Sequence, residues 1–228
     1  GRDSTYLEWM FKAWGWTVGV SLTALVVALV VGSIIGVIRT LPDSPWLTRF
    51  GNAWVELFRN IPLLVQIFIW YFVLPALVPP LKNLPSFALV VCALGLFTSA
   101  RIAEQMRAGI FSLPRGQRQA ALALGMSTWQ TYRYVLIPMA VRIILPPLTS
   151  ESMNLVKNSA VAFAVSVAEL TQYAMQVQEE TARPIEVYLA VTVLYVVSAL
   201  AVNRVLGLIE KSMRVPGLVA SSRTPGGR

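Results

Sequence analysis

The chain has 228 residues, of which 56% are hydrophobic and 13% are charged, and it carries a net charge of +8. A soluble domain typically has about 25% charged residues and divides its apolar residues into amphipathic stripes. Here they form long uninterrupted runs, so the composition excludes an ordinary soluble domain and predicts an all-α, polytopic membrane protein.

The residue types exclude several further classes. Basic residues gathered in cytoplasmic loops explain the positive charge better than nucleic acid as a partner does. There is no histidine and one cysteine, Cys92, which excludes a histidine general base, a Ser-His-Asp triad and a disulfide framework. A metal site would need a cluster of carboxylates, and none occurs. We therefore expect no catalytic residue, cofactor or metal ion in this chain.

The first apolar run covers residues 16–38, which are 23 residues without a charge. That length crosses a hydrocarbon core of about 30 Å as a helix. Trp9, Trp14 and Trp16 stand at its start, as an interfacial aromatic belt would. Residues 1–15 are expected to form an external N-terminal segment, with the transmembrane domain covering 16–210.

The second run covers residues 61–81 and also lacks charges. Pro62 suits the first turn of a helix, where its missing N–H does no harm. The helix is expected to end or kink at three later prolines. These are Pro75, Pro79 and Pro80.

The third run covers residues 84–100 and is extended by Arg101, Glu104 and Arg107. The three charges fall at i, i+3 and i+6, so they share roughly one helix face. One interpretation is a salt-bridged or snorkelling helix end. The other places Arg101 and Glu104 in a substrate pathway.

The fourth region is irregular. Residues 141–156 are apolar but contain Pro146-Pro147, and polar residues at 157–159 precede a second apolar stretch, 160–168. This pattern predicts a broken helix followed by a partly embedded segment. Irregular backbone at membrane depth persists only where protein or a water-filled path satisfies it.

Glu151, Asn154 and Lys157 recur at i, i+3 and i+6 in this region. A charge at membrane depth costs on the order of 2.5–3.5 kcal/mol on insertion scales, so these side chains should face protein or water. They are candidates for the substrate pathway, where a cation would favour an anionic substrate. The alternatives are a Glu–Lys pair that stabilises the broken helix, or Lys157 at the outer interface of the membrane.

The fifth run, 187–202, becomes long enough to span only if its helix continues to about residue 208. The segment 169–186 before it resembles an acidic external loop, and residues 211–228 are expected to form a flexible cytoplasmic tail. With the N-terminus outside, 14 Lys and Arg lie inside and five lie outside. The bias predicts five spans, with the N-terminus outside and the C-terminus in the cytoplasm.

The loop 112–138 between the third and fourth regions is too polar to span. Residues 117–124 are alanine-rich and predict a short helix that Gly125 can end with φ > 0. Small alanines on one face would let the cleft of another protein close over the loop.

A second short helix is expected after that glycine, over residues 129–136. Ser127 or Thr128 can cap its start, and Pro138 should stop it. The loop would then present two short helices at an angle.

Gln119-Ala-Ala-Leu-Ala-Leu-Gly125 is followed twelve residues later by Ile137-Pro138-Met139-Ala140. This stretch resembles the EAA loop of permease subunits of binding-protein-dependent ABC importers, with Gln119 where the pattern has Glu. The resemblance implies that the loop couples the permease to an ATPase. The implied coupling residues are Gln119, Ala120, Ala121, Gly125, Met126 and Trp129.

Other segments resemble the polar amino acid group of these permeases, namely 56–63, 112–117 and 154–160. Segments 95–105 and 149–159 favour the glutamate/aspartate branch in particular. The resemblance therefore implies import of an acidic amino acid by alternating access. A permease for glutamine, arginine or histidine is an alternative, and a stand-alone secondary transporter is a more distant one.

The resemblance also implies the partners. These are a second permease subunit, identical or different, two cytoplasmic ATPase subunits that use ATP and magnesium, and a periplasmic amino-acid-binding protein. The chain itself contains no Gly-x-x-x-x-Gly-Lys-Ser/Thr phosphate loop, so it is expected to be a transport subunit rather than an enzyme. Its expected location is the bacterial inner membrane.

Overall fold

A computed structural model describes residues 5–42 and 44–213, and these residues contain helices and no strand. The all-α prediction is confirmed. The elements are α1 (Tyr6–Ile38), α2 (Pro45–Asn60), α3 (Leu63–Phe68), the π-helix η1 (Ile69–Val73), α4 (Leu74–Leu77), the 3-10 helix η2 (Pro79–Asn83), α5 (Ser86–Phe111), α6 (Arg115–Ala123), α7 (Thr128–Thr131), the π-helix η3 (Tyr132–Leu136), α8 (Ile137–Asn158), the 3-10 helix η4 (Ser159–Val165), α9 (Leu170–Thr181) and α10 (Pro184–Met213).

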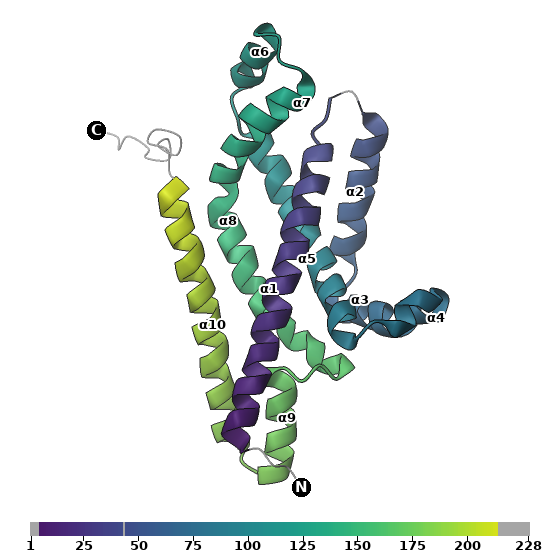
Figure 1. Ribbon diagram of the computed structural model, residues 1–228, viewed down its shortest axis with the longest axis vertical. Coiled ribbons are helices and arrows are strands. Elements are labelled where there is room, and N and C mark those ends of the chain that lie inside the picture. Colours follow the sequence, from purple (N-terminus) through teal and green to yellow (C-terminus); the bar gives the residue numbers. More distant parts are fainter. Residues whose placement is uncertain (1–4, 43, 214–228) are drawn as a thin grey trace, which may run out of the picture.

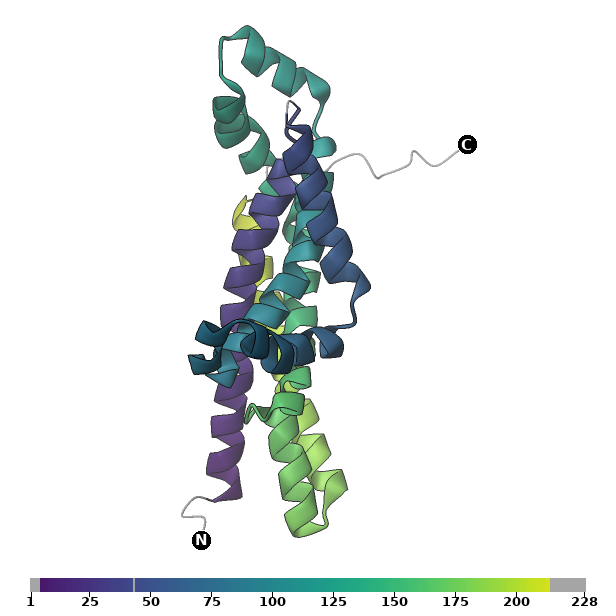
Figure 2. The same cartoon turned by 90° about the vertical axis from the view of Figure 1, so that its right-hand side faces the viewer.

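The molecule is elongated, with α1, α5, α8 and α10 running along its length and α3 and α4 lying across it (Figure 1). The hairpin of α6 and α7 lies at one end, and α9 lies with the start of α1 at the other (Figures 1 and 2). By length and composition, four helical segments could cross a membrane, or five if the bent pair of α2 with α3–α4 counts as one span. The predicted polytopic architecture is confirmed in that form.

Close packing of α1 on α5 forms the centre of the fold. A Cβ atom added at Gly32 would lie 2.7 Å from Cβ of Ile102, and one at Gly36 would lie 2.6 Å from Cβ of Met106. Real Cβ contacts are not this short, so the two backbones approach as they do only because these positions lack side chains. Small residues spaced by four are the usual device for such packing between membrane helices.

The first helix begins earlier than the apolar run. Thr5 caps it in a capping box with Glu8, and helix continues from Tyr6 through the expected external segment 1–15, of which residues 1–4 lie outside the described part. Packing explains the extension, because Ala13 is buried in an apolar cluster with residues of α9 and α10. The segment is therefore part of the bundle rather than a separate region.

The second span is not the straight helix expected over 61–81. Helix α2 begins sixteen residues before that run, and the chain then bends by 103° into α3 and α4. Nε2 of the buried Gln66 reaches back over the bend and donates to the carbonyls of Phe58 at 2.8 Å and Ile61 at 2.9 Å. This side chain satisfies backbone groups that the bend removes from the helix, as irregular backbone in a membrane requires.

The fourth region breaks within the polar residues 157–159, as expected, but its prolines do not interrupt the helix. Pro138 does not stop a helix, because the widened π-turn η3 precedes it and helix continues into α8. A π-bulge is a common way to accommodate such an interruption. Pro146 and Pro147 lie inside α8. The chain leaves α-geometry at Ser159, passes through η4 and turns at Ser166 with φ 58°.

Most of the acidic segment 169–186 is helical rather than a loop, because α9 covers Leu170–Thr181 and α10 begins at Pro184. The N-cap of α9 is the fully buried Glu169, whose carboxylate accepts from the backbone N–H of Thr171 at 2.8 Å and Gln172 at 2.9 Å and from the Tyr195 hydroxyl at 2.6 Å. Burial raises the pKa of the Glu169 carboxyl, and these hydrogen bonds oppose the rise. The carboxylate thereby ties α9 to α10.

The last helix continues past residue 208, as its length required. Helix α10 runs to Met213, so residues 211–213 of the predicted tail are helical. Residues 214–228 lie outside the described part, and the prediction of a flexible tail is not tested there.

Replacement of Gln66 by Leu tests the bend. The variant leaves the part-buried carbonyls of Phe58 and Ile61 without that donor, at a cost below the roughly 1–3 kcal/mol of a fully buried orphaned group. We expect a lower unfolding temperature for the detergent-solubilised protein. Gln176→Leu is the control, since Gln176 makes no side-chain hydrogen bond within the described residues. Equal unfolding temperatures for the two variants would contradict this account of the bend.

Candidate functional site

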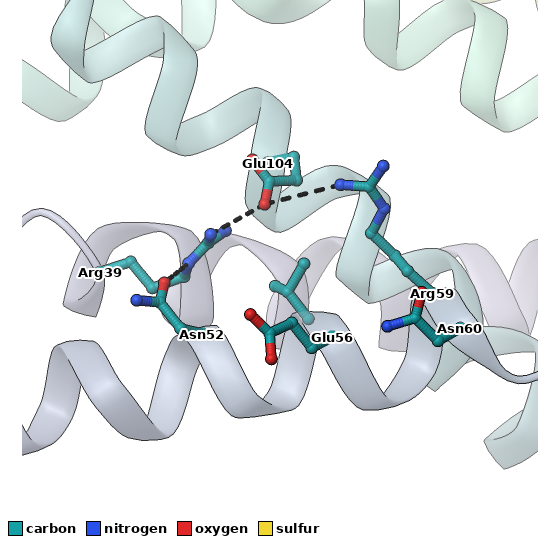
Figure 3. A pocket seen from close by; sticks show the side chains of 7 residues that line it. Arg39, Asn52, Glu56, Arg59, Asn60 and Glu104 are labelled. Carbon is teal, nitrogen blue, oxygen red and sulfur yellow. Dashed lines mark hydrogen bonds and ion pairs between the residues drawn. The ribbon is translucent and has the colours of Figure 1, made fainter.

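Two charged cavities lie side by side where α2 bends, and they share Arg59 and Glu104. The first has a volume of about 300 Å³ and is lined by Arg39, Asn52, Val55, Glu56, Arg59, Asn60 and Glu104 (Figure 3). The second has a volume of about 450 Å³ and is lined by Arg59, Phe97, Arg101, Glu104, Gln105 and Glu151. Helices α2 and α5 contribute to both, with α1 at the first and α8 at the second.

A buried ion pair lies between the cavities and the α1–α5 packing. Nη2 of Arg39 donates to Oε1 of Glu104 at 2.8 Å, and Nε donates to Oδ1 of Asn52, also at 2.8 Å. The Arg39 side chain is only 6% exposed. Burial of a cation is costly unless it is paired and hydrogen-bonded, so Glu104 and Asn52 are what make the position of Arg39 possible.

Arg59 contacts the same carboxylate in a different way. Its Nη1 lies 3.8 Å from Oε1 of Glu104, beyond hydrogen-bond distance, and its side chain is 55% exposed. Figure 3 shows this guanidinium reaching toward Glu104 from the side opposite to Arg39. Arg59 also lies in the last turn of α2, where the negative end of the helix dipole favours a cation.

A second loose ion pair lines the larger cavity. Nη1 of Arg101 lies 3.7 Å from Oε1 of Glu151, and the guanidinium lies over the Phe97 ring, 5.3 Å from its centroid. The pair joins α5 to α8. The separation is beyond hydrogen-bond distance, so the two groups can part without breaking a hydrogen bond.

The structure brings together three of the five predicted pathway residues, Arg101, Glu104 and Glu151. Asn154 and Lys157 do not line this cavity. Lys157 is exposed at the last turn of α8, and Glu151 pairs with Arg101 rather than with it. The alternative of a Glu–Lys pair within the broken helix is therefore wrong.

Sequence reasoning missed Arg39, Asn52 and Arg59. They lie between the first two apolar runs, where no spacing pattern marked them as candidates. A usable signal existed, because Arg39 directly follows one apolar run and Arg59 directly precedes the Asn-Ile-Pro that opens the next. Charges at such positions often snorkel or pair within the bundle.

The hairpin 112–138 forms the second candidate site. Helix α6 ends at Ala123, Gly125 has φ 80°, and Ser127 caps α7 in a capping box with Gln130. The predicted roles of Gly125 and Ser127 are confirmed, although α7 has only one turn before η3. The hydroxyl of Tyr132 donates to the carbonyl of Thr40 at 2.6 Å, which fixes the hairpin to the end of α1.

The tip of this hairpin exposes large apolar side chains. Leu124 is 83% exposed and Trp129 is 67% exposed. Gln119 and Ala120 are also exposed, Met126 is half-buried and Ala121 is buried. Of the predicted coupling residues, Ala121 therefore packs inside the hairpin, and the others lie at its surface. An exposed apolar group of this kind is typical of a protein interaction site.

Below the tip, a cavity of about 540 Å³ opens between the hairpin and the ends of α1 and α5, lined in part by Arg118, Gln119 and Tyr132. Within residues 5–42 and 44–213, no group of three or more His, Cys, Asp or Glu side chains could hold a metal ion.

Comparison with known proteins identifies relatives over nearly the whole chain. Residues 28–215 match the family described as binding-protein-dependent transport system inner membrane component. The chain is 43% identical to the glutamate/aspartate import permease protein GltJ of Escherichia coli K12 over 225 residues, which cover 94% of this chain and 91% of that protein. It is 33% identical to the glutamine transport system permease protein GlnP of the same strain, over 87% of this chain and 90% of that protein.

Solved structures show the same architecture. A chain of an amino acid ABC transporter solved with histidines has a TM-score of 0.79 at 31% identity, covering 91% of this chain and 95% of that chain. A chain of the inward-facing methionine ABC transporter MetNI has a TM-score of 0.78 at 21% identity, covering 93% of this chain and all of that chain. The second likeness shows the fold alone.

The two arginines that share Glu104 should differ in their importance for stability. Arg39→Gln leaves a carboxylate without its buried partner, which costs about 3–5 kcal/mol when a pair is fully buried and less here because Glu104 is partly exposed. Arg59→Gln removes only a long, exposed contact and should cost less than about 1 kcal/mol. Thermal unfolding of the purified protein measures both. A larger loss for Arg59→Gln would contradict this account of the cluster.

Proposed function

Because the chain belongs to the family of binding-protein-dependent transport system inner membrane components, it is a permease subunit of an ABC importer, and we propose that its substrate is glutamate or aspartate. The 43% identity to a glutamate/aspartate import permease over 94% of the chain supports this substrate class. The relation to a glutamine permease, at 33% identity, makes glutamine the second candidate.

The observation that carries the proposal is the charged cavity of about 450 Å³ at the bend. An amino acid presents a carboxylate and an ammonium group, and the loose pair of Arg101 and Glu151 offers a partner for each. Glu104 is a second carboxylate in the cavity, already neutralised by Arg39. Transporters commonly place their substrate sites where broken helices meet near the middle of the membrane.

Asn154 and Lys157 are assigned a place further along the substrate pathway. They follow Glu151 by one and two turns on α8, toward η4, where the chain leaves regular helix. Lys157 would attract an anionic substrate along this route. Neither Asn154 nor Lys157 lines the larger cavity, so only their position on α8 supports this assignment.

The orientation follows from the charge bias. With the N-terminus outside and the C-terminus in the cytoplasm, 14 of 19 Lys and Arg lie inside, as the positive-inside rule favours. The α6–α7 hairpin is then cytoplasmic and α9 is periplasmic, in the inner membrane of a bacterium. The subunit would work beside a second permease, two ATPase subunits that hold ATP and magnesium, and a periplasmic amino-acid-binding protein.

In this arrangement the hairpin docks on an ATPase subunit. Its surface residues Gln119, Ala120, Gly125, Met126 and Trp129 would contact the partner, whereas the buried Ala121 would hold the hairpin together. The bond from Tyr132 to Thr40 would make the hairpin move with α1.

Nucleotide-driven closure of the ATPases would rock these helices between two states. The charged cavity would then open alternately to the two sides of the membrane. An amino acid could cross only after that change of access.

Trp129→Ala tests the docking surface. Exposed tryptophans at protein interfaces often contribute about 2 kcal/mol or more to binding, so we expect ATP hydrolysis stimulated by the loaded binding protein to fall several-fold in proteoliposomes. Trp46→Ala is the matched control, because Trp46 is 69% exposed on α2 and belongs to no part of the hairpin. Normal stimulation in the Trp129 variant, or an equal loss in both, would refute docking at this residue.

The substrate class is tested by the stimulation itself. The complete importer in proteoliposomes should hydrolyse ATP faster with glutamate- or aspartate-loaded binding protein than with the unloaded protein. The physical reason is that the loaded protein favours one of the two access states. If binding protein loaded with glutamine, arginine or histidine stimulates ATP hydrolysis instead, the proposed acidic substrate is wrong and that amino acid is the substrate.

A further inference from the structure

We propose that Arg59 determines the specificity for acidic amino acids by binding the side-chain carboxylate of the substrate. The assignment rests on the proposed function, since it names a further residue of the same cavity. It goes beyond that function because it distinguishes the residues that bind the α-carboxylate and ammonium groups of any amino acid from the residue that binds the side-chain carboxylate of glutamate or aspartate.

The position of Arg59 fits this role. It is in the last turn of α2, next to the 103° bend, and it lines both charged cavities. Its side chain is 55% exposed in this chain, and among residues 5–42 and 44–213 its one ion-pair contact is the 3.8 Å approach to Glu104. The guanidinium can therefore turn into the larger cavity without losing a hydrogen bond.

Glu104 does not depend on Arg59 for its charge to be compensated. The hydrogen bond of 2.8 Å from Arg39 falls on the same oxygen, Oε1, and Arg39 is held in turn by Asn52. Release of Arg59 would thus leave the hydrogen bond between Arg39 and Glu104 intact. Arg39, by contrast, cannot leave Glu104 without breaking a hydrogen bond.

Within the part of the chain that the structure describes, Arg59 is distinguished by its lack of a hydrogen-bonded partner and not by the count of charges. The larger cavity is lined by two cations, Arg59 and Arg101, and two carboxylates, Glu104 and Glu151. Glu104 already accepts a hydrogen bond from Arg39, which lines only the smaller cavity. Arg59 therefore faces the larger cavity without a hydrogen-bonded carboxylate of its own among the described residues, and a cation in this position favours an anionic occupant.

Glutamate matches this arrangement group for group. Its α-carboxylate and ammonium group can take the Arg101–Glu151 pair, which would serve any amino acid equally. Its second carboxylate then falls to Arg59, whose planar guanidinium binds carboxylates with two parallel hydrogen bonds. Glutamine would place a neutral amide there and give Arg59 no charged partner, which disfavours it.

The test is equilibrium binding of radiolabelled glutamate to the purified importer complex without its binding protein, with competition by unlabelled glutamine. Arg59→Gln should weaken glutamate binding about tenfold or more and leave glutamine binding unchanged. Arg101→Gln should weaken both. Arg49→Gln is the matched control, because Arg49 is exposed on the same helix and lines neither cavity, and it should bind both amino acids normally.

The outcomes separate this assignment from the proposed function. Suppose that Arg101→Gln weakens binding of both amino acids. If Arg59→Gln then has no effect, or weakens glutamate and glutamine binding equally, the cavity is the substrate site but Arg59 does not determine its specificity. Absence of saturable glutamate binding to the unmodified complex would overturn the cavity and the assignment together. Should Arg59→Gln unfold at lower temperature, Arg59→Lys replaces it. That variant keeps the cation and should still prefer glutamate, and a folded Lys variant without the preference would overturn the assignment equally.

Discussion

The close approach of α1 and α5 is the constraint on which the other features depend. At Gly32 and Gly36 there is no room for a side chain, so the two helices lie together along much of their length. This packing brings Arg39, which caps the end of α1, to within 2.8 Å of Glu104 on α5. The pair then holds Asn52 and so positions α2. A membrane helix pair packed through small residues can thereby support a buried charge that no single helix could stabilise.

Irregular backbone marks the middle of the molecule, and side chains satisfy it there. Gln66 bonds the carbonyls left free at the α2–α3 bend. On the other side of the cavity, α8 tolerates two internal prolines and then passes into η4. Both departures from regular helix lie close to charged groups in the chain, Arg59 in one case and Lys157 in the other. Such backbone is maintained in membranes only where it lines a cavity or is covered by protein.

A continuous set of contacts joins the hairpin to the charged cavities. Tyr132 in the hairpin is bonded to Thr40, the next residue is Arg39, and the Arg39 side chain grips Glu104. The two candidate sites are therefore parts of one packed unit and not independent surfaces. Loosely held Arg59 and Arg101 stand at the edge of this unit, where a small molecule can reach them, whereas Arg39 is enclosed within it.

The sequence by itself determined the class of the protein and much of its local structure. Long uncharged runs require membrane helices, and Gly125 and Ser127 set the hairpin because glycine accepts φ > 0 and serine caps a helix start. Three of the five pathway candidates, which line one cavity, could be named from the sequence. Glu151 was a candidate because a charge at membrane depth is costly, and Arg101 and Glu104 were candidates because their spacing places them on one helix face. Only the tertiary structure decided which charges pair, since Arg39 and Glu104 are 65 residues apart, and where the helices break. Those outcomes depend on packing between distant segments, which composition and local spacing do not encode.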